Sequence, residues 1–150
     1  MTVGPRHATT IGVIQQQLLK VLVDEEVAIR VQQPVTLSES EPEPDVSIVR
    51  GSLSDYMTHH PCQEDVLLCI EVSDSSLKYD RTTKLQVYAR AGIPEYWIVN
   101  LNEEHVEVYR TPDPSAGTFL EDFIVPRKSF LSLNIDDQSV ELAISELLPC

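Results

Sequence analysis

The stretch Val-Leu-Leu-Cys-Ile-Glu-Val at residues 66–72 decides the fold, because it is apolar on both faces until Glu71. A strand with this profile lies at the centre of a sheet and is covered on both sides. Residues 95–101, Glu-Tyr-Trp-Ile-Val-Asn-Leu, predict a second strong strand. Neighbouring residues of a strand point to opposite faces, so we expect Trp97 and Ile98 to enter different layers.

Two helices are expected around this pair of strands. Residues 80–91 show a helical pattern, with Asp80 as a candidate N-cap and Gly92 as a candidate stop. A second amphipathic helix is expected at about residues 9–24, where apolar side chains recur at helical spacing. Its apolar positions are Ile11, Ile14, Leu18, Val21 and Leu22.

The remaining chain consists of shorter strands and loops. Alternating patterns predict strands at 27–31, 45–50, 106–110 and 119–125. Apolar residues between 130 and 135 precede a short helical stretch that ends at Leu148. No internal repeat or linker interrupts the order. The sequence therefore predicts one α/β domain over residues 1–150, with a mixed central β-sheet flanked by α-helices.

Composition limits the classes of function. The chain has 150 residues, 42% of them hydrophobic, which argues against global disorder. Its 11 Lys and Arg residues stand against 24 Asp and Glu residues, which gives a formal charge of −13. Such a surface repels polyphosphate at long range and argues against a protein that coats DNA or RNA non-specifically. The charge is still compatible with a small local nucleic-acid site or with a cation site.

The sequence also bears on the compartment. No apolar run approaches the roughly 18 residues of a membrane span, and residues 1–10 do not resemble a signal peptide. The three cysteines, Cys62, Cys69 and Cys150, are too few for a disulfide framework. We therefore expect a cytoplasmic protein that makes no contact with a membrane.

Two carboxylates are the first candidates for chemistry. Asp45 begins a predicted strand, and Glu71 ends the apolar run, where the sheet is expected to open to solvent. Two carboxylates that converge at a sheet edge are typical ligands of Mg²⁺, a hard cation that takes oxygen ligands and keeps several waters. Such an ion can activate water at a phosphodiester. The alternative is that both acids are solvated strand ends.

A helix face supplies the next candidates. Asp80 and Lys84 are four residues apart and share one face, with Tyr88 one turn further on. From there Lys84 can reach back toward Glu71 and stabilise a developing charge. The alternative is that Asp80 is an N-cap and Lys84 forms a weak surface pair.

Other motifs are weak or missing. His59, His60 and Cys62 lie on a weakly patterned segment, and no second pair of soft ligands completes a zinc site. The sequence contains no Gly-rich phosphate loop, no Gly-x-Ser-x-Gly and no Cys-x-x-Cys.

Four strings in order resemble the Uma-two family of restriction-endonuclease-like proteins. They are Pro-Glu-Pro-Asp-Val (42–46), Leu-Cys-Ile-Glu-Val-Ser (68–73), Tyr-Asp-Arg-x-x-Lys-x-x-x-Tyr (79–88) and Gly-Ile-Pro-Glu-Tyr-Trp-Ile-Val (92–99). The resemblance covers about residues 7–148, and the four strings together are far more specific than any one of them.

The resemblance implies a PD-(D/E)xK nuclease fold with a metal site at the sheet edge. Asp45 matches the aspartate of the Pro-Asp element, and Glu71 matches the second acid. The usual lysine two residues after that acid is Ser73 here. The resemblance suggests that Lys84 takes over the lysine role, with Asp80 beside it.

Two functions follow from this resemblance. One is a DNA endonuclease that uses Mg²⁺, or Mn²⁺ in its place, with Asp45 and Glu71 as metal ligands and Lys84 as an electrostatic helper. The other is a non-catalytic binding or assembly domain that keeps the fold, which the charge of −13 favours. His7 matches a histidine at the start of the first helix in relatives. A homodimer is suggested by analogy with paired nuclease domains.

Overall fold

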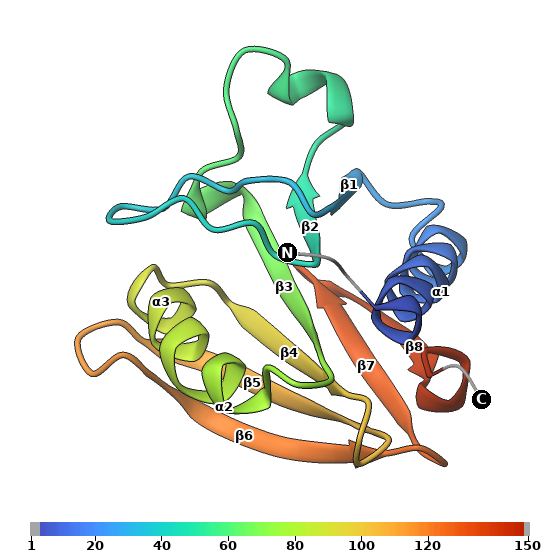
Figure 1. Cartoon of the computed structure of the whole chain (residues 1–150). Coiled ribbons are helices and arrows are strands. Elements are labelled where there is room, and N and C mark those ends of the chain that lie inside the picture. The colour runs from blue at the N-terminus through green and yellow to red at the C-terminus, as the bar shows by residue number, and fades with distance from the viewer. Residues whose placement is uncertain (1–3, 149–150) are drawn as a thin grey trace.

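A computed structural model describes residues 4–148 (Figure 1). The chain runs from a long helix, α1, through three strands and a helical segment to five further strands. The main elements are α1 (Pro5–Val21), β1 (Val27–Val31), β2 (Val46–Arg50), β3 (Val66–Ser73), α2 (Leu77–Tyr79), α3 (Leu85–Arg90), β4 (Glu95–Asn100), β5 (His105–Asp113), β6 (Thr118–Pro126), β7 (Phe130–Ile135) and β8 (Gln138–Ala143).

Six strands form one mixed sheet in the order β1-β2-β3-β4-β5-β6. Only β3 and β4 run parallel, because the helical segment between them returns the chain to the starting edge. Every residue of β3 and of β4 is buried, as a central strand with both faces covered requires. The predicted fold class, a mixed central sheet flanked by helices, is confirmed.

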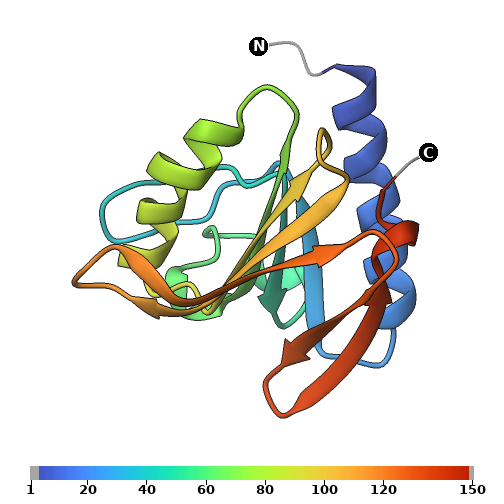
Figure 2. The same ribbon diagram turned by 90° about the horizontal axis from the view of Figure 1, so that it is seen from below.

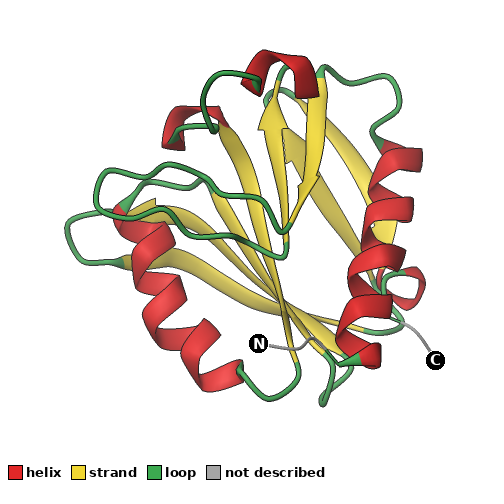
Figure 3. Ribbon diagram, turned by 45° about the horizontal axis from the view of Figure 1, so that its top comes forward, coloured by secondary structure: helices red, strands yellow, loops and turns green. Residues whose placement is uncertain are grey.

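Two layers cover the sheet, one on each face (Figures 2 and 3). Helix α1 and the β7–β8 hairpin pack on one face, over a core that includes Ile70 and Trp97. Helices α2 and α3 cover the other face, over a core that includes Ile98 and Tyr96. Trp97 and Ile98 therefore enter different layers, as the alternation predicted. None of the described helices has the length and apolar character needed to span a membrane.

Removing one methyl group at the centre of the sheet tests this packing. Ile98 is fully buried, so Ile98→Val is expected to lower the free energy of unfolding by about 1 kcal/mol. The measurement is urea denaturation of both proteins. Leu120→Val, at a position that is 68% exposed on β6, is the control and is expected to change stability by less than about 0.5 kcal/mol.

The helical segment after β3 differs from its prediction in one important way. It starts at Leu77, contains a π-helical turn over Asp80–Lys84 and ends at Arg90, before Gly92 with φ +74°. The prediction that Asp80 caps this helix is wrong, because Asp80 lies inside it. Ser76 precedes the first turn instead. A π-turn adds a residue to the helical repeat and changes the direction of the side chains around it.

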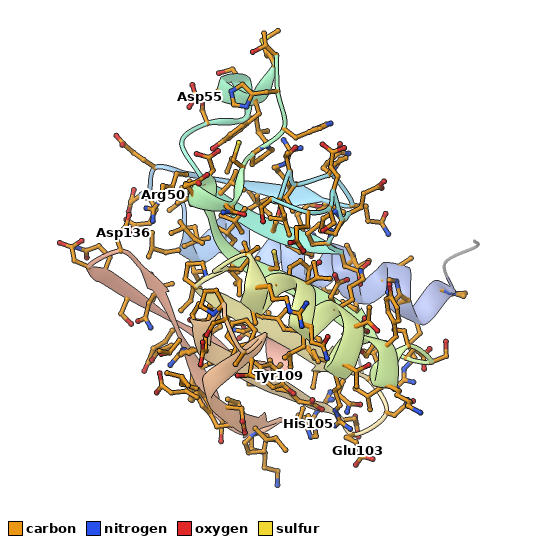
Figure 4. The ribbon with its side chains drawn as sticks, turned by 90° about the vertical axis from the view of Figure 1, so that its left-hand side faces the viewer. Arg50, Asp55, Glu103, His105, Tyr109 and Asp136 are labelled. Carbon is orange, nitrogen blue, oxygen red and sulfur yellow. The ribbon has the colours of Figure 1, made fainter. Side chains whose placement is uncertain are left out.

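The ends of the chain also differ from prediction. Helix α1 starts at Pro5 rather than near residue 9, since proline fits the first helical position, where no N–H is needed. Much of the predicted helical tail is strand β8, which pairs with β7, and only Ile144–Glu146 form a 3₁₀ turn. Arg50 donates two 2.6 Å hydrogen bonds to Asp136, beside it in Figure 4, and ties the β7–β8 turn to β2. Cys150 lies outside the described residues.

Candidate functional site

Asp45 and Glu71 meet at one end of the β2–β3 pair. Asp45 directly precedes β2, and Val46 pairs with Ile70 across the antiparallel ladder. The backbone N–H of Asp45 donates to Glu71 Oε1 at 3.3 Å, and the N–H of Val72 donates to Asp45 Oδ2 at 2.8 Å. The structure thus brings the two predicted metal ligands together at one end of the β2–β3 pair.

Lys84 approaches this pair from the helix. Its Nζ donates to Glu71 Oε2 at 2.9 Å, and the hydroxyl of Tyr88, one turn later, donates to the same oxygen at 2.6 Å. The π-turn ends at Lys84, so the irregular helix aims this side chain at the sheet. Lys84 keeps 22% of its side chain exposed, so this side chain is accessible from solvent although it is paired with Glu71.

Glu71 is buried, contrary to the expectation that its carboxylate lies where the sheet opens to solvent. Only 3% of it is exposed, because the helix covers this face of β3. Burial raises the pKa of Glu71 to about 7, against the opposing effect of Lys84, and the nearby Asp45 carboxylate adds to the increase. Burial alone would lower the pKa of Lys84, because it disfavours the charged form. The attraction of the Glu71 carboxylate and its hydrogen bond outweigh this effect and raise the pKa of Lys84.

Asp80 is placed beside the cluster and fixes the helix. Its Oδ2 accepts hydrogen bonds from the hydroxyls of Ser73 at 2.5 Å and of Ser76 at 2.8 Å. The hydroxyl of Tyr96 donates to the backbone carbonyl of Asp80 at 2.9 Å. Ser73, which occupies the position where the resemblance leads one to expect a lysine, therefore anchors the helix that carries Lys84.

His7 lies in the first turn of α1. Its Nε2 is 3.2 Å from Asp45 Oδ2. Its Nδ1 is buried and has no hydrogen-bond partner within residues 4–148. Local sequence carried no signal for this contact, because α1 and β2 are brought together only by the fold.

Glu107 is a buried acid that sequence reasoning missed. Arg81 in the π-turn binds it through two hydrogen bonds of 2.8 and 2.5 Å. His105 and Tyr109, which lie along β5 below α3 in Figure 4, also contact it. Burial alone would raise the pKa of Glu107, but hydrogen bonds with Arg81, His105 and Asn100 outweigh this effect and lower the pKa to about 2. The Arg81–Glu107 pair thus holds the helix against β5, one turn before Lys84.

An open cleft of about 440 Å³ gives access to the cluster. The start of α1 forms one wall, and the loop after β3 with the start of the helical segment forms the other. Its lining includes His7, Asp45, Glu71, Tyr79 and Lys84. Within residues 4–148, no three or more His, Cys, Asp or Glu side chains are arranged to hold a metal ion. Two carboxylates with room for water fit Mg²⁺ better than zinc, which needs three or four protein ligands.

Comparisons with known proteins agree with this architecture. The model of the Uma2 family, described as "Putative restriction endonuclease", matches residues 1–140. Among solved structures, a putative nuclease belonging to DUF820 from Anabaena variabilis shares the fold, with a TM-score of 0.70 and 15% sequence identity. The superposition covers 98% of this chain and 82% of that one. None of the curated proteins matches the chain.

Proposed function

Since the chain belongs to the Uma2 family of restriction-endonuclease-like proteins, we propose that it is a metal-dependent endonuclease that hydrolyses phosphodiester bonds in DNA. The observation that carries this proposal is the cluster of Asp45, Glu71 and Lys84 at an open cleft. Packing alone does not account for a lysine and two acids at this place, because a buried carboxylate costs stability unless it is compensated.

The donor set of the cleft fits Mg²⁺, with Mn²⁺ as a substitute. Asp45 and Glu71 would hold the ion, and their oxygens are the hard ligands that it prefers. When bound, Mg²⁺ supplies positive charge near the phosphate oxygens and lowers the pKa of water. A cation also favours the ionised form of Glu71, whose pKa of about 7 leaves it only partly charged at neutral pH.

Lys84 supplies the charge that comes from the protein itself. Its ammonium holds Glu71 in place and is partly exposed to the cleft, so it can donate a hydrogen bond to a phosphate oxygen of a bound strand. Such a fixed positive group stabilises the extra negative charge of the transition state. Asp80 and Arg81 act as positioning residues, since both lie at the start of the π-turn and fix it, Asp80 to Ser73 at the end of β3 and Arg81 to Glu107 on β5.

A second candidate is a binding or assembly domain that does not cleave. The charge of −13 favours it, because a nuclease must attract phosphates. The two candidates differ in a single observable, which is whether DNA is cut when a divalent cation is present.

The test is cleavage of supercoiled plasmid and of single-stranded circular DNA at low salt, in Mg²⁺, in Mn²⁺ and in EDTA. We expect cleavage by wild type in either cation, none in EDTA, and a loss of at least about a hundredfold in Asp45→Asn. Asp24→Asn is the matched control, because Asp24 is exposed beyond the C-terminal end of α1. No cleavage of either DNA by wild type in both cations would leave the binding domain as the better account.

A further inference from the structure

The cleft has an exposed aromatic side chain that the chemistry described above does not use. Tyr79 lines the cleft together with Lys84 and Glu71, and 53% of it is exposed. Its side chain makes no hydrogen bond or ring contact with any other residue in 4–148. A tyrosine that contributes neither to the core nor to a hydrogen-bond network leaves its ring face free for a ligand.

The size of the cleft limits what can reach the cluster. About 440 Å³ is within the range of pockets for small molecules, and it admits an unstacked nucleotide but not a double helix. Glu71 is 3% exposed, so a phosphate must enter the cleft to approach it. A strand that is already single can do so without the cost of unpairing a base.

The charges around the cleft also disfavour a duplex. Proteins that grip duplex DNA neutralise several phosphates, typically about six to ten. Here Lys84 is the one Lys or Arg among the described residues that line the cleft, and Arg6, on the first turn of α1, is 3.5 Å from Asp74. Stacking on an aromatic ring contributes binding without added positive charge and accepts every base.

We propose that the substrate is single-stranded nucleic acid, and that Tyr79 stacks on the base next to the phosphate that enters the cleft. This inference rests on the proposed nuclease function and names its substrate class. The Tyr79 ring acts in binding, and Lys84 acts on the phosphate.

The experiment measures binding first, by fluorescence anisotropy of a labelled 12-nucleotide strand and of the same sequence as a duplex. The protein carries Lys84→Ala to prevent cleavage, and Mg²⁺ is present. We expect the single strand to bind more tightly than the duplex. Adding Tyr79→Ala is expected to weaken single-strand binding about tenfold, the contribution of one stacked base, whereas Tyr79→Phe keeps it. Leu120→Ala, an exposed apolar residue on β6, is the control.

Cleavage by the protein with Lys84 intact separates this inference from the function it rests on. Tyr79→Ala is expected to raise KM for single-stranded DNA about tenfold, with the smaller change in kcat. If wild type cleaves DNA but Tyr79→Ala binds and cleaves single strands as wild type does, the role of Tyr79 is wrong and the nuclease function stands. Equal or tighter binding of the duplex would overturn the substrate class. If wild type binds single strands but never cleaves, the proposed function fails and the Tyr79 contact survives.

Discussion

Lys84→Ala is expected to lower the rate of DNA cleavage at least about a hundredfold, which corresponds to roughly 3 kcal/mol of transition-state stabilisation. Lys84 Nζ is 2.9 Å from Glu71 Oε2, and in the proposed function this ammonium donates to a phosphate in the cleft. The loss should fall on kcat more than on KM, because developing charge is greatest in the transition state. The loss of rate is measured by single-turnover cleavage of a labelled strand in saturating Mg²⁺.

The control for this variant is a second lysine on the same helical segment. Lys78 is exposed in the first turn of the segment, and its side chain makes no hydrogen bond or ion pair with any other residue in the described part of the chain. Lys78→Ala is therefore expected to change cleavage by less than about threefold. Thermal melting of both variants shows whether they are folded. If Lys84→Ala folds and cleaves at the wild-type rate, Lys84 has no part in the reaction.

The stability of the metal-free protein is expected to fall by about 3 kcal/mol as the pH rises from 4.5 to 8, through Glu71 alone. The pKa of Glu71 is about 7 in the folded protein, against 4.5 for an exposed glutamate. The folded state therefore holds its proton where the unfolded state has lost it. The stabilisation is complete below pH 4.5 and is lost as the pH rises through 7.

Glu71→Gln isolates this effect, because the amide does not titrate. The free energy of unfolding, from urea denaturation in EDTA, is measured for both proteins between pH 4.5 and 8. Other groups with a raised pKa, such as Glu95, contribute to both proteins and cancel in the comparison. We expect the free energy of unfolding of wild type to fall with rising pH relative to that of Glu71→Gln. Parallel curves would mean that Glu71 titrates like an exposed acid.

The centre of the fold was predictable from sequence, and its boundaries were less so. The runs 66–72 and 95–101 are apolar on both faces, and only a covered central strand is compatible with that pattern. The register between β3 and β4 carries no such local signal. Strand β8 was also missed, because its alternation is weak and its partner β7 determines the conformation.

The candidate site could be predicted in part, for a physical reason. Asp45, Glu71 and Lys84 were identifiable because strand alternation and helical spacing fix which face each side chain occupies. The burial of Glu71 was not predictable, since it depends on how the helical segment after β3 folds back and packs on this face of the strand. The Arg81–Glu107 pair was missed as well, because Glu107 alternates with Val106 and Val108 and reads as a solvent-facing strand residue.

The most direct measurement of the central claim, that Asp45 and Glu71 hold one divalent cation together, is a calorimetric titration of MnCl₂ at pH 8. Wild type and Asp24→Asn are expected to bind one Mn²⁺ with the same affinity. Asp45→Asn and Glu71→Gln are each expected to bind at least about tenfold more weakly, because each removes one of two carboxylate ligands. Equal affinity in all four proteins, or no binding by wild type, would contradict the claim.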